Sequence, residues 1–178
     1  NIDKTVRKGL ELSLNHSIGD MHYQLGYNFL DATFGSSFTS FSPLNPQGPN
    51  RTVNSGDAIP GHAKHMVKAN IDYELSDNLT TGHAMVLASD QYYRGDEANE
   101  NEKIDGYQVI NFYLRYNIID NLSLHLRINN LLDEDYHTFG TYGEADEVLE
   151  DIYPDVEAPN FVGPAAPRQV ALKLKYAF

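Results

Sequence analysis

The sequence lacks several residue types that would point to particular kinds of chemistry. It contains no Cys, which excludes disulfide frameworks, thiol catalysis and thiolate metal sites. It contains no Trp, and its 25 Asp and Glu residues outnumber its 13 Lys and Arg residues, for a formal net charge of -12. Because so acidic a chain repels phosphate backbones, we expect no nucleic-acid partner.

Long apolar runs and targeting signals are also missing. The longest apolar run, from Ala84 to Ala88, is far shorter than the roughly 20 residues that a membrane helix needs. The chain opens on Asn1-Ile2-Asp3-Lys4, without a Met or a signal-peptide core. We therefore expect either a mature product or a piece of a longer chain.

The sequence is rich in Tyr and Phe, with 12 and 8 residues, and this aromatic content favours strands. The main pattern is an alternation of apolar and polar residues, as where Val67, Ala69 and Ile71 alternate with Lys68 and Asn70. Seven segments show it, the fourth less clearly because residues 84–88 are apolar on both parities. They are residues 10–18, 21–29, 67–75, 79–92, 110–118, 122–128 and 170–178. The sequence predicts seven strands and no helix.

Alternation alone fits a soluble antiparallel sheet or a barrel with one face toward lipid, and the strand length favours the barrel. The segments run for about nine residues, against about five or six in an ordinary strand. At about 3.3 Å per residue and a tilt of about 40°, nine residues rise about 23 Å, close to the apolar band of an outer-membrane barrel.

The connections between the segments are short and long in alternation. Three are tight turns: Gly19-Asp20, Ser76-Asp77-Asn78 and Asp120-Asn121. The others are long and polar, at residues 35–62, after Tyr93 and at residues 140–165. Outer-membrane barrels sort their periplasmic turns and extracellular loops in this way, whereas a soluble sandwich has no reason to do so. We therefore predict an all-β fold, an antiparallel transmembrane β-barrel segment.

Aromatic residues of apolar parity gather near the short turns and the C-terminus. This position suits an interfacial girdle, with rings at the acyl boundary and hydroxyls toward the headgroups, although ordinary cross-strand packing is an alternative. The residues are Tyr23, Tyr73, Tyr116, Tyr176 and Phe178.

Five stretches, in order along the chain, resemble motifs of TonB-dependent outer-membrane receptors. The last is similar to the terminal strand of that family, which ends on an aromatic residue recognised by the barrel-assembly machinery. The stretches are IPGHAKH at 59–65, YYRGDEAN at 92–99, NNLLDEDY at 129–136, GPAAPR at 163–168 and PRQVALKLKYAF at 167–178. The resemblance assigns an assembly signal to Leu172, Leu174, Tyr176 and Phe178.

The resemblance implies a 22-stranded barrel with an N-terminal plug in its lumen, of which seven strands are about a third. We therefore expect residues 1–178 to be the C-terminal part of such a barrel, without its signal peptide, TonB box and plug. The implied function is TonB-energised uptake of a ferric siderophore or cobalamin across the outer membrane of a Gram-negative bacterium. The implied partners are outer-membrane lipid, the TonB complex, the barrel-assembly machinery and a metal-chelate or vitamin ligand. The alternatives are a passive porin or structural barrel, and then a soluble β-sheet binding module.

The sequence offers little for catalysis or for metal binding. Seven His residues occur, but they lack the spacing of three or four converging zinc ligands. The acidic residues of segment 144–157 lack the ligand spacing of an EF-hand, so a solvated loop is favoured over a Ca²⁺ site. No G-x-S-x-G elbow is present. We expect no enzyme activity, no cofactor and no metal.

Ligand contacts from the long connections remain as a candidate function. The resemblance implies that extracellular loops and the outer lumen wall capture the substrate. Aromatic faces with polar tips suit a ferric chelate or a cobalamin-like ligand, while packing in an upper girdle is the alternative. The candidates are Tyr92, Tyr93, Arg94, Tyr136, His137, Phe139 and Tyr142.

Overall fold

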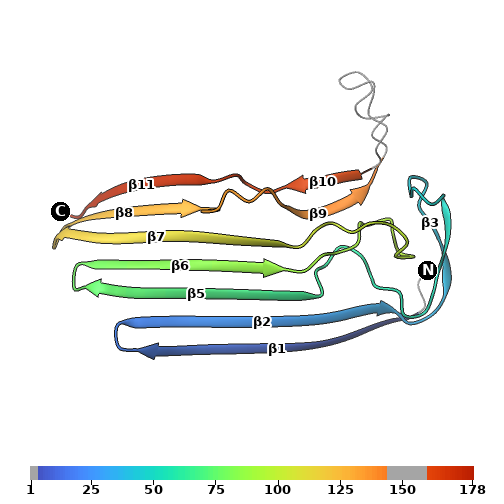
Figure 1. Ribbon diagram of the computed structural model, residues 1–178, viewed down its shortest axis with the longest axis horizontal. Coiled ribbons are helices and arrows are strands. Elements are labelled where there is room, and N and C mark those ends of the chain that lie inside the picture. The colour runs from blue at the N-terminus through green and yellow to red at the C-terminus, as the bar shows by residue number, and fades with distance from the viewer. Residues whose placement is uncertain (1–3, 144–159) are drawn as a thin grey trace, which may run out of the picture.

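The computed structural model describes residues 4–143 and 160–178. Its main feature is one antiparallel sheet of seven strands in the order β1-β2-β5-β6-β7-β8-β11 (Figure 1). These are β1 (Thr5–Ile18), β2 (Met21–Phe34), β5 (His65–Ser76), β6 (Leu79–Ala88), β7 (Tyr107–Ile119), β8 (Leu122–Asn129) and β11 (Gln169–Tyr176). The seven predicted strands are confirmed, and they are 8 to 14 residues long. Across the described ranges, no helix is long and apolar enough to cross a membrane.

The register of the strands keeps the apolar positions together on one side of the sheet. Leu14 pairs with Leu25, Leu25 with Ala69, Ala69 with Met85 and Met85 with Ile110, so one apolar row crosses five strands. We call this side the apolar face and the opposite side the polar face. The apolar face is exposed: Leu12 on β1 and Leu172 on β11 keep 55% and 68% of their surface accessible. Water is a poor solvent for such a face, which is suited to lipid.

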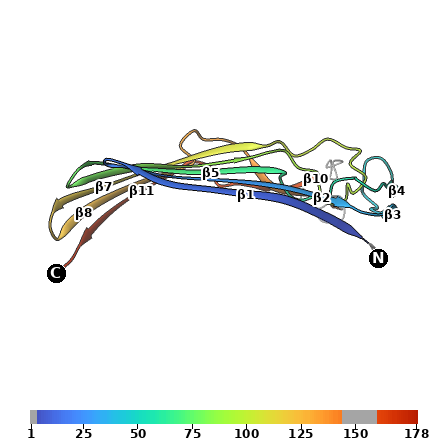
Figure 2. The ribbon, with the colours of Figure 1, turned by 90° about the horizontal axis from the view of Figure 1, so that it is seen from below.

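The polar face carries the charged and hydroxyl side chains of the alternation. It holds a hollow of about 710 Å³, lined among others by Asp72, Tyr113, Arg115, His125 and Arg127. The sheet is curved rather than flat, and both of its edge strands bend toward the same side (Figure 2). Within the described residues β1 and β11 each pair on one side alone, so the sheet is an open part of a barrel.

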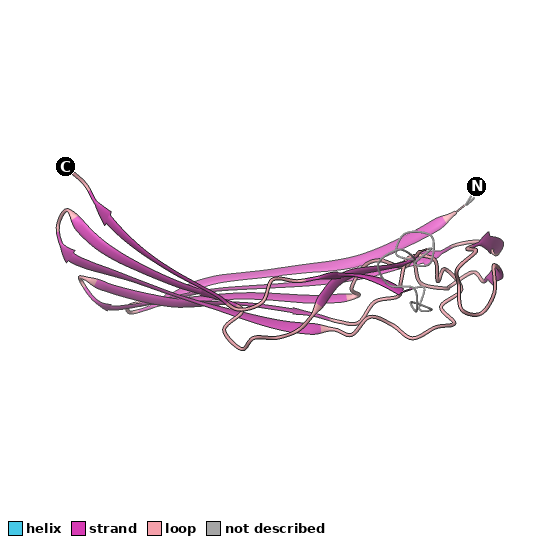
Figure 3. Ribbon diagram, turned by 90° about the horizontal axis from the view of Figure 1, so that it is seen from above, coloured by secondary structure: helices cyan, strands magenta, loops and turns pink. Residues whose placement is uncertain are grey.

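The connections are sorted by length between the two ends of the sheet (Figures 1 and 3). The tight turns at Gly19-Asp20, Asp77-Asn78 and Asp120-Asn121 share one end, which we call the turn end. Gly19 has a φ of 56°, a conformation that most residues avoid in a tight turn. The long connections share the opposite end, the loop end. The predicted alternation of short and long connections is confirmed.

The long connections contain structure that the sequence did not predict. In the segment predicted as a polar loop, β3 (Phe38–Phe41) pairs with β4 (Asn50–Val53), and further on β9 (His137–Tyr142) pairs with β10 (Asn160–Pro164). A buried cluster of Phe34, Val53 and Ala98 holds the first of these loops against the sheet. This small core lies at the loop end, which makes the loops an ordered platform.

Candidate functional site

Residues 92–94 lie against β9 at the loop end, so the structure brings the two groups of predicted ligand residues together. The backbone N–H of Arg94 donates to the carbonyl oxygen of Gly140 at 3.0 Å. The N–H of Tyr142 donates to the carbonyl oxygen of Arg94, also at 3.0 Å. This parallel bridge positions side chains that are more than 40 residues apart in the sequence.

Four of the predicted residues form two pairs at this bridge, Tyr93 with Tyr142 and Arg94 with Phe139, which we call together the aromatic group. The Tyr93 and Tyr142 rings stack with centroids 5.4 Å apart and an interplanar angle of 12°. The Arg94 guanidinium lies 5.9 Å from the centroid of the Phe139 ring, within cation–π range. The stacked aromatic faces suit an aromatic ligand, and the guanidinium on the Phe139 ring suits an anionic one.

The other three predicted residues lie around this group or away from it. His137 and Tyr136 line a hollow of about 420 Å³ together with Tyr93. Tyr136 also packs on Tyr107, with ring centroids 4.6 Å apart. Tyr92 lines a different hollow. The Lys103 ammonium lies over the Tyr92 ring, 4.8 Å from its centroid. Tyr93, Tyr136, His137 and Tyr142 therefore gather around one hollow, Arg94 and Phe139 form a separate contact at the same bridge, and Tyr92 lies elsewhere.

The segment YYRGDEAN folds as an anchor between loops. Gly95 has a φ of 101°, and the next side chain, Asp96, is completely buried. The Asp96 carboxylate accepts hydrogen bonds from the N–H groups of Glu100 and Asn101, at 3.1 and 3.0 Å. It also accepts one from the Asn101 side-chain amide at 2.9 Å. Its negative charge therefore stabilises a loop.

Asn99, the last residue of the same segment, joins this loop to the preceding one. Its φ of 58° turns its side chain toward Ala58. The side-chain oxygen accepts from the Ala58 N–H at 2.6 Å, and the amide donates to the Ala58 carbonyl at 3.0 Å. The sequence analysis did not predict that Asp96 and Asn99 hold the loops together. A charged residue directly after a Gly in a turn was nevertheless a signal that its side chain would accept hydrogen bonds from the loop backbone.

The segments NNLLDEDY and GPAAPR form a second anchor, between β8 and β11. Asn130 is 3% exposed, with a φ of 51°. Its side-chain amide donates to the carbonyls of Glu134 and Ala166, at 2.8 and 3.2 Å. The Asp133 carboxylate accepts from the Arg168 N–H at 2.9 Å and from its guanidinium at 3.2 Å. These contacts set where β9 and β11 begin.

Three of the four proposed assembly residues lie on the apolar face of β11, the last strand of the sheet, and Phe178 follows the end of this strand. Leu172 pairs with Leu126, and Leu174 with Leu124. Tyr176 is 55% exposed, and its ring centroid lies 5.8 Å from that of Phe178. An exposed apolar row at an edge strand is compatible with the predicted assembly signal, which stays a prediction.

Metal-binding groups do not gather in the part of the chain that the structure describes. No three His, Asp or Glu side chains there lie close enough together to hold an ion. The acidic segment 144–157, considered for Ca²⁺, lies outside the described residues.

The stacked tyrosines have perturbed acidity. Burial, then the nearby charge of Asp96 and the Tyr93 ring, raises the pKa of Tyr142 to about 12. Burial and the charges of Asp105 and Glu102 also raise the pKa of Tyr93. Both phenols are therefore neutral at physiological pH, so they offer hydroxyl groups and aromatic faces to a ligand and no phenolate.

We expect the Tyr142 phenol to ionise near pH 12 in the folded protein. An unfolded tyrosine ionises near pH 10. The neutral Tyr142 phenol therefore contributes fully to the free energy of unfolding below about pH 10, and this contribution is lost as the pH rises toward 12. The measurement is the tyrosinate absorbance of the wild type minus that of Tyr142→Phe. A difference curve with its midpoint at or below pH 10 would contradict the stacked, partly buried geometry.

Comparison with known proteins identifies the family. The family TonB dependent receptor-like, beta-barrel, matches residues 1–131. The vitamin B12 transporter BtuB of Photobacterium profundum is 27% identical over 142 residues, which are 80% of this chain and 20% of that protein. The probable TonB-dependent siderophore receptor PiuA of Acinetobacter baumannii is 30% identical over 139 residues, 78% of this chain and 18% of that protein.

The fold comparison agrees with the sequence comparison. The crystal structure of the siderophore receptor PiuA from Acinetobacter baumannii superposes with a TM-score of 0.73 at 23% identity, over 97% of this chain and 22% of that chain. The chain spans about a fifth of the length of the curated relatives it matches. The match of the family over residues 1–131 shows that the chain belongs to the TonB-dependent receptor β-barrel family.

Proposed function

We propose that the chain is the C-terminal part of an outer-membrane receptor that takes up a scarce nutrient complex with energy from TonB. In this proposal the plug, the TonB box and the signal peptide precede residue 1 in the complete protein, and further strands close the barrel. The relatives are named as a vitamin B12 transporter and a probable siderophore receptor, which supports a metal-chelate or vitamin ligand.

The observation that carries the proposal is the division of the sheet into two environments. An exposed apolar face, with Leu172 at 68% exposure, is stable only in lipid. The polar face holds a hollow lined by Arg115, His125 and Arg127, as expected of a lumen wall. The turn end then faces the periplasm and the loop end the exterior, because barrels of this kind have short periplasmic turns. No chemistry for catalysis is required, since the family consists of receptors and transporters.

We propose the aromatic group and the adjacent hollow as part of the substrate site. Tyr93 and His137 line the hollow of about 420 Å³, Tyr142 stacks on Tyr93, and Arg94 offers a positive charge over the Phe139 ring. The group lies at the loop end, where a ligand arrives from outside the cell. Two anchors hold it in place, so the site is preorganised and loses little entropy on binding.

The test is uptake by a strain in which the complete receptor is the sole route for a labelled ferric siderophore or cobalamin. We expect accumulation of one of these ligands, and a loss of accumulation in an otherwise identical strain without TonB. Arg94→Ala should lower the affinity without lowering the amount of receptor in the outer membrane. Accumulation that persists without TonB would instead identify a passive porin.

A further inference from the structure

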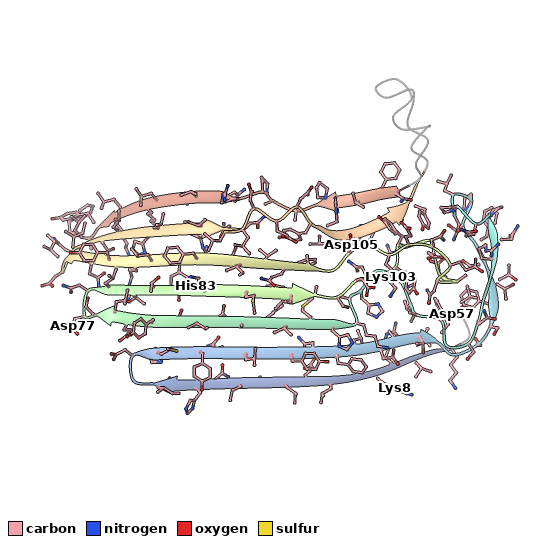
Figure 4. The ribbon with its side chains drawn as sticks, in the orientation of Figure 1. Lys8, Asp57, Asp77, His83, Lys103 and Asp105 are labelled. Atoms are coloured by element: carbon pink, nitrogen blue, oxygen red, sulfur yellow. The ribbon has the colours of Figure 1, made fainter. Side chains whose placement is uncertain are left out.

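Gly82 on β6 is the point where side chains of both neighbouring strands meet on the polar face. It pairs with Asp72 of β5 on one side and with Tyr113 of β7 on the other. The next residue along β6, His83, which Figure 4 labels, has the parity of the apolar face. Although the polar face is open, Gly82 is buried, so its two neighbours cover it.

The Tyr113 ring lies directly over the bare backbone of Gly82. A β-carbon built on Gly82 would lie 2.5 Å from both Cζ and Oη of Tyr113, and 2.7 Å from Oδ1 of Asp72. These separations are well inside van der Waals contact, so no side chain larger than hydrogen fits beneath the ring where it lies. The phenol from β7 and the carboxylate from β5 reach over β6 from opposite sides. We call Gly82, Tyr113 and Asp72 the glycine slot.

The residues around the slot keep the long side chains of β7 close to the sheet. The Thr81 hydroxyl donates to the Tyr113 carbonyl at 3.1 Å, which fixes the backbone from which the ring extends. The Arg115 guanidinium reaches across β6 in the same way and donates to the Thr80 hydroxyl at 3.4 Å. Beyond the slot, β6 presents the small side chain of Ala84 to the polar face. The backbone of β6 is therefore the lowest part of this surface.

The glycine slot lies in the hollow of about 710 Å³ on the polar face, which Asp72, Tyr113 and Arg115 line. A ring that lies against β6 leaves this space free, whereas a ring that stands away from the wall would occupy it. Any side chain at position 82 would displace the ring, because the far end of Tyr113 can rotate while the paired backbones of β6 and β7 are fixed. The absence of a side chain at Gly82 therefore controls how open the hollow is.

We propose that Gly82 is a positioning residue for transport, which holds the Tyr113 ring against the wall and keeps the hollow open for the passage of substrate. A Gly in a strand interior is unfavourable relative to Ala, and it often marks the close approach of another group. Here the group that approaches is the Tyr113 ring. The proposal rests on the proposed function, because it treats the polar face as the wall of a transport lumen.

The first measurement is the midpoint temperature at which the complete receptor loses its heat-modifiable gel mobility. It compares the wild type, Gly82→Ala, Tyr113→Ala and the double variant. Gly82→Ala should lower the midpoint of the wild type, because the ring loses its packing against β6. In the Tyr113→Ala background the same substitution should raise the midpoint, because Ala suits a strand better than Gly once the ring is gone. An equal shift in both backgrounds would overturn the glycine slot.

The matched control is Gly26→Ala, at a strand glycine on the polar face of β2. Among the described residues, a β-carbon at Gly26 would meet the Lys68 carbonyl oxygen alone, at 3.9 Å. Gly26→Ala should therefore leave the midpoint unchanged or raise it, and its shift should be the same with and without the Tyr113 ring. A fall as large as that of Gly82→Ala would overturn the assignment, because any strand glycine would then behave in this way.

The second measurement is the initial rate of uptake of labelled ferric siderophore or cobalamin, divided by the amount of folded receptor in the outer membrane. Gly82→Ala should lower this rate, and the double variant Gly82→Ala/Tyr113→Ala should restore it, because the hollow is open again. A wild-type rate in Gly82→Ala, or a low rate that the second substitution does not restore, would overturn the role in transport. If the wild type takes up neither ligand, the proposed function fails and the transport role with it, whereas the midpoint temperatures still decide on the slot.

Discussion

Replacing Leu126 by Arg is expected to prevent the complete receptor from inserting into lipid vesicles. Leu126 lies in the middle of β8 and pairs with Leu114 on one side and Leu172 on the other, all on the apolar face. An Arg at the midplane of a lipid-facing barrel strand costs about 2–4 kcal/mol. The measurement is the fraction of receptor that shows heat-modifiable mobility on a gel after insertion.

The control for Leu126→Arg is the neighbouring residue, which already is an Arg. Arg127 lines the hollow of the polar face with Arg115 and His125, so Arg127→Gln should change stability by less than about 0.5 kcal/mol. The two substitutions concern adjacent positions of one strand and differ in the face they affect. If both variants insert as well as the wild type, the apolar face of β8 does not contact lipid.

The sheet was largely predictable because its two faces require opposite residue types. Alternation of Leu and Ile with Ser, His and Arg along residues 122–128 predicted the strand that the structure places at 122–129. The turns were predictable because residues such as Gly19 adopt backbone conformations that others avoid. The least certain segment, 79–92, forms β6 over residues 79–88. Its apolar residues of both parities did not reveal where the strand ends.

The loops were predicted as polar and long, and their internal order was missed. The β3–β4 hairpin is closed by Val53, which is fully buried against Phe34 and Ala98. These three residues come from segments that are 19 and 45 positions apart (53 minus 34, 98 minus 53), so no local pattern joins them. A core built from the end of β2, from β4 and from the loop after β6 is visible only after the loops are placed on the sheet.

The candidate site was predicted in composition but not in arrangement. Tyr93 and Tyr142 were both proposed as ligand residues from their residue type, and the structure stacks them on each other. One face of each ring is therefore turned toward the other ring. Resemblance to the family drew attention to residues 92–99 and 129–136, but their role as anchors depends on Ala58 and Ala166, which are far away in the sequence.

Replacing Asp96 by Ala is expected to release the loop that carries Tyr93 and Arg94. The substitution leaves the N–H groups of Glu100 and Asn101 without their acceptor in a buried place. Each such unsatisfied donor costs about 1–3 kcal/mol, so the local stability of the loop should fall by about 2–6 kcal/mol. The measurement is hydrogen exchange at the amides of residues 94–104 in the complete receptor.

The effect of Asp96→Ala should extend to the preceding loop and to the ligand site. Asn45 donates to the Gly95 carbonyl at 2.9 Å and accepts from the Asn101 amide at 3.1 Å, so exchange should also accelerate around Asn45. The pKa of Tyr142 should fall, because the carboxylate of Asp96 contributes to raising it. If the proposed site binds a nutrient complex, its affinity should fall with the loss of the preorganised aromatic group.

Asp77→Ala is the matched control for Asp96→Ala, since it removes an exposed carboxylate at the turn end (Figure 4). Exchange at residues 94–104 and the Tyr142 pKa should both be unchanged in this control. Asp96→Asn retains one side-chain oxygen as an acceptor, so its loop should be intermediate between the wild type and Asp96→Ala. If Asp96→Ala leaves exchange at residues 94–104 as slow as in the wild type, the buried carboxylate is not what holds the loop. The positions of Tyr93 and Arg94 would then depend on their contacts with β9 alone.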